Sequence, residues 1–225
     1  MEANGHISKL AKKPWPTKRA MIQVYEKKLW GGNQTDFYSG VGSHHPQIIA
    51  PYHKDLIAFL SDFEHPLTVC DLGCGDFNIG SKLVEYTQFY HAVDIVPELV
   101  KRNKKKFDLK NLEFYCLDIS NDVLPAADCV LLRQVLQHLS NKEILRIIKK
   151  LSAFKYVIIT EHVPAGEYEP NRDIISGQGI RLKKQSGVKV LSAPFNLKVI
   201  EEKLLSAIDL GKGKGVIETT LYQLW

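Results

Sequence analysis

Short apolar runs, rich in β-branched residues, recur along the middle of the chain with helical patterns between them. Such runs are typical of strands that are buried on both faces of a sheet. Strands that alternate with helices of this length predict a parallel sheet that is covered by helices on both sides. The runs that we interpret as strands are 67–72, 89–94, 112–117, 127–132 and 156–160.

Helices are predicted between these runs. Ser140 and Asn141 precede a helix at about 142–151, whose apolar residues recur every three or four positions and mark a buried face. Pro97 can begin a helix after the second strand, because proline fits the first helical turn. The glycines after the first strand predict a turn that opens a further helix. The apolar positions of the 142–151 helix are Ile144, Leu145, Ile147, Ile148 and Leu151.

The pattern changes after the fifth strand. Residues 163–196 contain three prolines and several glycines and show no convincing helix. Two later runs, 199–209 and 216–225, flank the glycine-rich sequence 211–215, which predicts an antiparallel hairpin with a glycine turn. Residues 201–207 fit a helix equally well, so both alternatives stay open at this point.

The length and composition fit one α/β domain. The chain has 225 residues, of which 44% are hydrophobic and 24% charged, and it shows no internal repeats. No apolar run approaches the roughly 18 residues that a membrane span needs, so we expect no membrane association. The first 17 residues are polar and Lys-rich, without the apolar core of a signal peptide. We therefore expect a cytoplasmic protein.

The four cysteines and the net charge of +5 exclude few functions. No two cysteines have the spacing of a redox or zinc motif, so we interpret them as reduced and mostly buried thiols. The densest basic run, 101–106, is interpreted as the solvated face of a helix. A nucleic-acid surface is the alternative for this run. No aromatic residues are interleaved with its lysines, so nucleic acid is not the expected partner.

The strongest candidate motif follows the first strand, where Asp71 precedes Gly73 and Gly75. Glycines allow a backbone to approach a ligand closely and to adopt positive φ angles. The spacing departs from the dinucleotide fingerprint, because the third glycine of that fingerprint would fall at Asn78. Asp71 would also repel a pyrophosphate, whereas a ligand that carries an ammonium group tolerates this acid.

Two further acids end the next two strands. Asp94 lies about twenty residues after the glycines, where it can accept hydrogen bonds from ribose hydroxyls. Asp118 ends the third strand and can accept a hydrogen bond from an adenine amino group. The alternatives make Asp94 a cap of the following helix and Asp118 a turn residue before Ser120 and Asn121.

On these motifs, residues 45–162 resemble the class I S-adenosylmethionine-dependent methyltransferases. The resemblance implies an α/β fold with a Rossmann-like, doubly wound and mostly parallel seven-stranded sheet that ends in the antiparallel hairpin. It implies S-adenosylmethionine as the cofactor and S-adenosylhomocysteine as the product. It also implies that residues 128–139 line the methionine end of the cofactor. The implied cofactor-binding residues are Asp71, Gly73, Gly75, Asp94, Ile95, Asp118, Ile119, Arg133 and Gln134.

Glycines, hydroxyls and aromatic residues are interleaved in 30–32 and 37–45, ahead of the first predicted helix. This pattern predicts a mobile segment that closes over the cofactor, with Tyr38 as a cofactor contact and His44 as an acceptor contact. Adjacent histidines rarely chelate one ion, and no cysteine or aspartate partners are suitably spaced, so we expect no metal. The predicted parts of the chain are an N-terminal covering arm, 1–45, and the methyltransferase domain, 46–225, in which 163–196 is an insertion at the acceptor site.

Methyl transfer from a sulfonium is an in-line displacement, so alignment can supply most of the catalysis. A hydroxyl acceptor usually also needs a general base, and the ends of the fourth and fifth strands are where such a group would lie. His138 is the favoured base, and Glu161 and His162 are the second candidates. The alternative is that His138 caps or packs within the turn before the helix.

Two arginines of the 163–196 segment, Arg172 and Arg181, are the predicted acceptor-binding residues. A guanidinium group can hold a carboxylate or a phosphate through two parallel hydrogen bonds. Ordinary surface or structural ion pairing is the alternative for both side chains.

The sequence therefore predicts transfer of a methyl group to an O or N atom of a small polar molecule, anionic molecules included. A nucleic-acid methyltransferase is an alternative, but the chain lacks an Asp-Pro-Pro-Tyr run and a Pro-Cys pair. A catalytically silent partner subunit with the same fold is another alternative. The intact acids and glycines oppose it, since a silent subunit need not keep them together.

Overall fold

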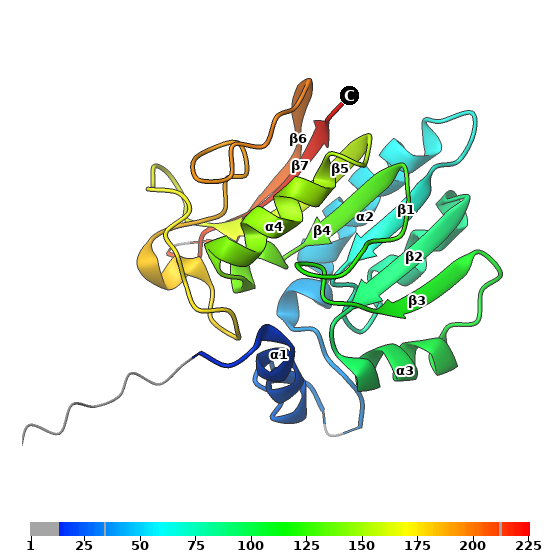
Figure 1. Ribbon diagram of the computed structural model, residues 1–225, viewed down its shortest axis with the longest axis horizontal. Helices are drawn as coiled ribbons and strands as arrows, with labels where there is room; N and C mark the ends of the chain where they lie inside the picture. Colours follow the sequence, from blue (N-terminus) through cyan, green and yellow to red (C-terminus); the bar gives the residue numbers. More distant parts are fainter. Residues whose placement is uncertain (1–13, 34, 212) are drawn as a thin grey trace, which may run out of the picture.

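The computed structural model describes residues 14–33, 35–211 and 213–225. These residues form one seven-stranded sheet with helices on both faces (Figure 1). The interpretation of residues 1–13 as a polar arm without a signal peptide lies outside the described residues. Within the described ranges, no helix is both long enough and apolar enough to cross a membrane.

The sheet has the strand order β3-β2-β1-β4-β5-β7-β6. Strands β1 to β5 are parallel, whereas β7 runs antiparallel to both β5 and β6. This arrangement confirms the predicted α/β fold with an antiparallel hairpin at its end. The chain order reverses between β1 and β4, so the loops after these strands diverge and leave space at their carboxyl ends. The strands are β1 (Thr68–Leu72), β2 (Phe89–Asp94), β3 (Leu112–Cys116), β4 (Cys129–Arg133), β5 (Tyr156–Val163), β6 (Glu201–Asp209) and β7 (Val216–Gln223).

Two of the α-helices begin at prolines, Pro46 and Pro97, which need no hydrogen-bond partner for a backbone N–H. A capping box between Ser140 and Glu143 starts the helix that follows β4. The α-helices in the described chain are α1 (Thr17–Glu26), α2 (Pro46–Ser61), α3 (Pro97–Lys106) and α4 (Asn141–Leu151). The short 3-10 helices are η1 (Val41–Ser43), η2 (Gly80–Lys82), η3 (Val84–Tyr86), η4 (Leu136–His138) and η5 (Arg181–Lys184).

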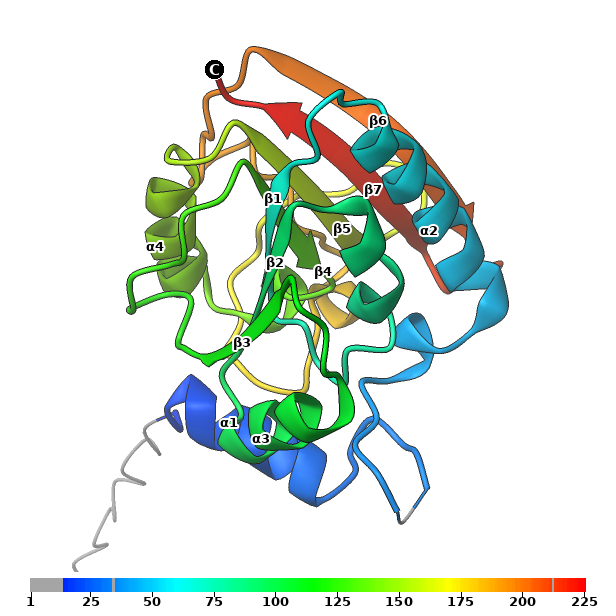
Figure 2. The same cartoon turned by 90° about the vertical axis from the view of Figure 1, so that its right-hand side faces the viewer.

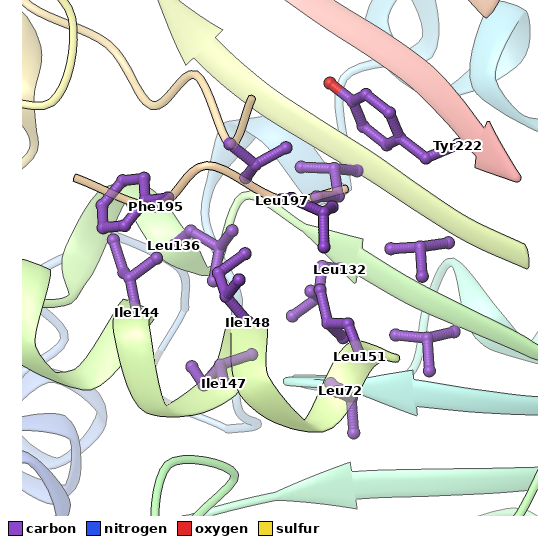
Figure 3. Packing of buried hydrophobic residues seen from close by; sticks show 14 of the residues in the cluster. Leu72, Leu132, Leu136, Ile144, Ile147, Ile148, Leu151, Phe195, Leu197 and Tyr222 are labelled. Atoms are coloured by element: carbon purple, nitrogen blue, oxygen red, sulfur yellow. The ribbon is translucent and has the colours of Figure 1, made fainter. Parts of the chain in front are cut away.

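Separate cores lie on the two faces of the sheet, with α4 on one side and α2 on the other (Figure 2). On the α4 face, the helix packs its apolar side against the strands, and residues 188–197 complete the layer. Figure 3 shows Phe195 and Leu197 beside Ile144 and Ile148 in this layer. On the other face, buried side chains of α2 share a core with Ile79 and Leu83, which flank η2, and with Val84 of η3. The α2 residues in that core are Tyr52, Leu56 and Leu60.

One predicted helix is wrong. No α-helix follows β1 in the described chain, because that segment forms the 3-10 turns η2 and η3. Phe77 opposes a continuous helix there: it has a left-handed φ of 62° and is fully buried against the rings of Tyr90, Phe107 and Phe114. The sequence left open whether residues 201–207 form a helix or a strand. They belong to strand β6, which pairs with β7.

Candidate functional site

A cavity of about 460 Å³ lies at the carboxyl ends of β1, β2 and β4, where the strand order reverses. Loops after these strands line it from the sheet side, with Gly73, Asp94 and Gln134 among them. Helix α1, the chain that follows it and the loop at 178–180 line it from the opposite side. In open α/β sheets, ligands bind at this edge. The cavity is therefore the candidate functional site.

The glycine loop between β1 and η2 lies directly against the cavity. Gly73 and Gly75 have φ angles of 86° and 58°, which side chains strongly disfavour. A Cβ atom on Gly73 would lie 2.5 Å from a methyl of Val135, and one on Gly75 would lie 2.4 Å from the Ser39 hydroxyl. Both positions therefore require glycine for the backbone angle and for close packing.

The carboxylate of Asp94 fixes this loop to the end of β2. Its Oδ2 accepts a hydrogen bond from Gly75 N at 3.0 Å, and its Oδ1 accepts one from Val96 N at 3.0 Å. Burial raises the pKa of Asp94, while the backbone donors act in the opposite direction. Each oxygen keeps a free lone pair, and both Asp94 and Ile95 line the cavity.

Asp118 lines the cavity beside Ile119 and also organises its own turn. Its Oδ1 accepts hydrogen bonds from the backbone and hydroxyl of Ser120, and its Oδ2 accepts one from the Asn121 amide. Burial raises the pKa of Asp118, but these donors outweigh it, so the pKa is lowered overall. Asp118 can therefore stabilise its own turn and still accept a hydrogen bond from a ligand, since one lone pair on Oδ2 has no partner among the described residues.

Asp71 lies outside the cavity lining, unlike the two glycines that follow it. Its carboxylate is buried and accepts a hydrogen bond from the Tyr90 hydroxyl at 3.0 Å. Burial raises the pKa of Asp71 to about 7, partly offset by that hydrogen bond. The Asp71 carboxylate is therefore held by Tyr90 in the interior and does not line the cavity.

Arg133 ends β4 and Gln134 follows it; both residues line the cavity, and each has a buried donor without a partner. Arg133 donates to Gly42 O and lies over the ring of Tyr52, whereas its Nε has no hydrogen-bond partner among the described residues. Gln134 Nε2 is likewise buried and unpartnered. Gln134 also has a left-handed φ of 55°, a strained backbone of the kind that occurs at functional sites.

His138 is the one predicted catalytic residue that lines the cavity. Its Nδ1 lies 3.2 Å from Gly177 O, and its ring lies 5.1 Å from the ring of Trp30. A carbonyl oxygen only accepts, so Nδ1 carries the proton, and the lone pair of Nε2 accepts a hydrogen bond from the Gln137 amide at 3.3 Å. Burial lowers the pKa of His138 to about 4, which keeps the ring neutral at neutral pH.

Glu161 and His162 lie outside the lining of the cavity. The Glu161 carboxylate is buried and accepts the backbone N–H groups of Leu136 and Gln137, both at 2.9 Å. His162 points its Nε2 at Lys214 O, 2.5 Å away. Neither side chain lines the cavity, so the structure does not bring these two candidates to the site of His138.

The three predicted acceptor contacts are also engaged within the protein. Arg172 is exposed and pairs with Glu169 at 2.6 Å. Arg181 is 1% exposed, and its guanidinium donates hydrogen bonds to protein oxygens, among them the backbone carbonyls of Leu136 and Leu139. His44 Nε2 lies 2.6 Å from the Asp76 carboxylate. None of the three lines the cavity, because each has a stronger partner elsewhere in the fold.

Comparison with known sequences and structures decides the family. The sequence matches the family described as "Methyltransferase domain" over residues 64–184, more than half of the chain. The chain belongs to this methyltransferase family. It is an enzyme of the class I S-adenosylmethionine-dependent type, with S-adenosylmethionine as its cofactor, as the motifs predict. No curated protein matches the sequence.

Solved structures share the fold of this methyltransferase at low sequence identity. The N-methyltransferase NodS from Bradyrhizobium japonicum WM9, in complex with S-adenosylhomocysteine, is 12% identical, with a TM-score of 0.64 over 91% of this chain and 98% of that chain. Magnesium protoporphyrin IX methyltransferase from Synechocystis PCC 6803, with bound S-adenosylmethionine, is 16% identical, with a TM-score of 0.56 over 95% and 100%. Human N-acetylserotonin methyltransferase is 14% identical, with a TM-score of 0.55 over 92% and 66%.

The N-terminal part of the methyltransferase contains a helix that the sequence reasoning missed. Helix α1 lies beside the carboxyl ends of the strands (Figure 1) and contributes Thr17, Met21 and Tyr25 to the cavity lining. The signal was present but short: Met21 and Val24 are buried at helical spacing behind Pro16. We name residues 17–44 the covering segment.

Hydrogen bonds fasten the covering segment to the rest of the fold. Ser39 N donates to the Asp76 carboxylate at 2.7 Å, and Asp76 N donates back to the Ser39 hydroxyl at 2.8 Å. Asp36 pairs with Arg102 of α3. Tyr38, a predicted cofactor contact, stacks on the His44 ring at 4.3 Å and does not line the cavity. Trp30, another aromatic residue of the covering segment, lines the cavity instead.

Proposed function

We propose that this enzyme transfers the methyl group of S-adenosylmethionine to an O or N atom of a small polar molecule within the 460 Å³ cavity. One observation carries the proposal: the strand-end residues expected for the cofactor and the histidine expected for the acceptor line the same covered cavity. A cavity of this volume lies in the range that small-molecule sites occupy. The covering segment favours a small acceptor over a nucleic acid, whose backbone would need a positively charged groove beside the cavity.

The cofactor half of the cavity offers one partner for each part of S-adenosylmethionine. The free lone pairs of Asp94 suit the ribose hydroxyls, and the remaining lone pair of Asp118 suits the adenine amino group. The unpartnered donors Arg133 Nε and Gln134 Nε2 suit the methionine carboxylate. Buried donors without partners are costly, so a carboxylate that satisfied both would bind favourably.

The acceptor half lies between Trp30, His138 and the loop at 178–180. His138 Nε2 can accept a hydrogen bond from an acceptor O–H or N–H group once that group takes the place of the Gln137 amide, which lies 3.3 Å away. Its lowered pKa makes it a weak general base, which suits orientation of the acceptor better than full removal of a proton. Lys183, exposed at the edge of the lining, is the cation placed to meet an anionic acceptor, in place of Arg172 and Arg181.

The first experiment is a calorimetric titration of the purified protein with S-adenosylmethionine, S-adenosylhomocysteine and NAD. We expect micromolar binding of the two sulfur ligands and none of NAD. Gln134→Glu places a negative charge beside the proposed carboxylate position, so the dissociation constant for S-adenosylhomocysteine should rise at least tenfold. Gln185→Glu is the matched control, because Gln185 shares a left-handed φ of 50° but is exposed and lies outside the cavity lining.

The acceptor is then sought by release of S-adenosylhomocysteine with amines, hydroxyl compounds and carboxylated or phosphorylated analogues. Folded protein that binds neither sulfur ligand would contradict the proposal and favour the silent-subunit alternative. Binding of S-adenosylhomocysteine that is unaffected by Gln134→Glu would move the methionine end elsewhere in the cavity. Salt-dependent binding of RNA would reopen the nucleic-acid alternative.

A further inference from the structure

The η4 turn, Leu136–His138, is only three residues long, yet it carries the side chains of Gln137 and His138 to the cavity. A single 3-10 turn leaves most of its backbone N–H and C=O groups without partners inside the turn. These groups are buried with Leu136 and Gln137, so other parts of the protein must satisfy them. What holds the turn therefore decides where both side chains point.

A buried carboxyl group holds the N-terminal end of the turn, and burial raises the pKa of this group to about 8, while its backbone donors act in the opposite direction. Glu161, at the end of β5, is 3% exposed, and its two oxygens accept the N–H groups of Leu136 and Gln137 at 2.9 Å each. The carboxylate thus takes two consecutive donors at the end where the turn dipole is positive. This geometry fixes the direction of the turn relative to β5.

A positive charge holds the opposite end. Arg181 Nη1 donates to Leu136 O at 2.9 Å, and Nη2 donates to Leu139 O at 2.7 Å. Nη2 also reaches Asn141 Oδ1 at 2.7 Å, at the start of α4. Within the described residues no salt bridge joins Glu161 and Arg181, so each side chain holds the turn through its own hydrogen bonds to the backbone.

We propose that Glu161 and Arg181 are positioning residues, which hold the η4 turn from its two ends and so set Gln137 and His138 toward the bound methyl donor. This inference rests on the proposed function for its catalytic meaning, but not for its geometry. It assigns a role to two buried ionisable groups that do not touch the cavity. Because Glu161 belongs to β5 and Arg181 to the 163–196 segment, the η4 turn connects these two parts of the fold beside the cavity.

Stability alone does not explain this arrangement. Burying a carboxylate and a guanidinium is costly, and apolar residues of similar volume commonly stabilise a core equally well. Fixed hydrogen bonds to four backbone groups give instead a single orientation of the turn. The surroundings of His138 agree with a fixed turn, because its ring is held between Gly177 O and Trp30.

The test follows the His138 ring by NMR in protein labelled with ¹⁵N-histidine, with the His138 signal assigned from a His138→Gln variant. In the wild type we expect the ring to titrate with a pKa near 4 and to shift when S-adenosylhomocysteine is added. In Glu161→Gln and in Arg181→Met, the pKa should rise above 5. The shift on ligand addition should fall by at least half.

Two controls separate positioning from general loss of stability. Val157→Ala removes two methyl groups from a fully buried position in β5, where Val157 pairs with Val130 and Tyr222 far from the turn. It should lower the melting temperature and leave the His138 titration unchanged. If Arg181→Met does not fold, Arg181→Lys replaces it, because a lysine keeps the charge but cannot bond Leu136 O, Leu139 O and Asn141 together.

Three results would overturn the inference. Folded Glu161 and Arg181 variants with a wild-type His138 titration would show that these two side chains do not hold the turn. If Val157→Ala altered the His138 titration as much as the Glu161 and Arg181 variants do, the effect of those variants would be explained by lost stability alone. Binding of S-adenosylhomocysteine without any shift of the wild-type His138 signal would place the turn away from the methyl donor. Failure of S-adenosylhomocysteine to bind contradicts the proposed function, while the titrations still test what holds the turn.

Discussion

The proposed cofactor half and the proposed acceptor half of the cavity are built differently. The cofactor half comes from short stretches that directly follow strands, such as Gly73–Gly75 and Asp94–Ile95, and is shaped largely by main chain. The acceptor half is assembled from α1, Trp30, the η4 turn and the loop at 178–180, which are distant in sequence. A ligand common to a whole family can be held by a local motif. An individual acceptor is held by a combination of segments.

Charge separates the two halves as well. In the proposed cofactor half, Asp94 keeps free lone pairs, and Arg133 Nε is buried without a hydrogen-bond partner among the described residues. In and around the acceptor half, Glu161, Arg181 and Arg172 are all engaged by protein atoms. Besides Lys183 and Glu143, the lining on the proposed acceptor side is made of rings, amides and apolar groups. Charged residues near an active site can thus serve its architecture and not its ligand.

The largest expected effect is on the cofactor half. Asp94→Asn puts an amide donor where the carboxylate now accepts the Gly75 N–H and would accept ribose hydroxyls. We expect calorimetry to show at least 100-fold weaker binding of S-adenosylhomocysteine, or about 2.7 kcal/mol. Asp108→Asn, at an exposed position, is the control. Unchanged affinity in folded Asp94→Asn would remove Asp94 from the cofactor site.

The second effect concerns pH and the acceptor half. The pKa of His138 is about 4 in the folded protein and 6.5 in the unfolded chain, so the unfolded chain binds more protons below pH 6.5. The free energy of unfolding should therefore fall as the pH drops from about 6.5 to about 4, with a contribution from His138 of about 2–3 kcal/mol. Urea unfolding at pH 7 and pH 4.5 measures it. If His138→Gln keeps the full slope, the histidine is not buried in its neutral form.

A third substitution tests whether the acceptor half and the cofactor half bind their ligands independently. Trp30→Ala removes a ring that lines the acceptor half and lies against His138. We expect the KM of the acceptor found in the screen to rise about tenfold, since a buried aromatic contact is lost. The dissociation constant of S-adenosylhomocysteine should change less than threefold. Trp15→Ala, at an exposed tryptophan outside the lining, should change neither. Equal losses of both ligands in Trp30→Ala would show that the two halves are not separate.

The smallest effect is expected at Arg172. Its guanidinium is about half exposed and pairs with Glu169, so Arg172→Met should change stability by less than about 0.5 kcal/mol. The KM for an anionic acceptor should stay the same in steady-state assays. A clear rise in that KM would restore Arg172 to the acceptor site and weaken the contrast drawn between the halves.

Sequence reasoning works well for the part of the fold that is locally encoded. The five parallel strands and the glycine loop follow from short apolar runs and from residues next to them. The lining position of Asp94, Asp118 and His138 follows because the carboxyl ends of parallel strands meet at one edge. These features depend on spacing along the chain, which the sequence displays directly.

The remaining features depend on contacts between distant residues. Nothing near Arg181 in the sequence indicates that its guanidinium will be buried against the carbonyls of Leu136 and Leu139, about forty positions away. The same holds for Glu161 and the η4 turn. The lost helix after β1 has a tertiary cause as well, since Phe77 is drawn into an aromatic cluster with residues of β2 and β3.

The Glu143 carboxylate belongs to three parts of the structure at once. It completes the capping box of α4, accepts a hydrogen bond from Thr17 at the start of α1, and accepts another from Ser176. Breaking any one of these contacts weakens the hydrogen bonds that position the others. The start of α1, the first turn of α4 and the chain around Ser176 should therefore open as one cooperative unit. In hydrogen exchange, their amides would share a single opening free energy.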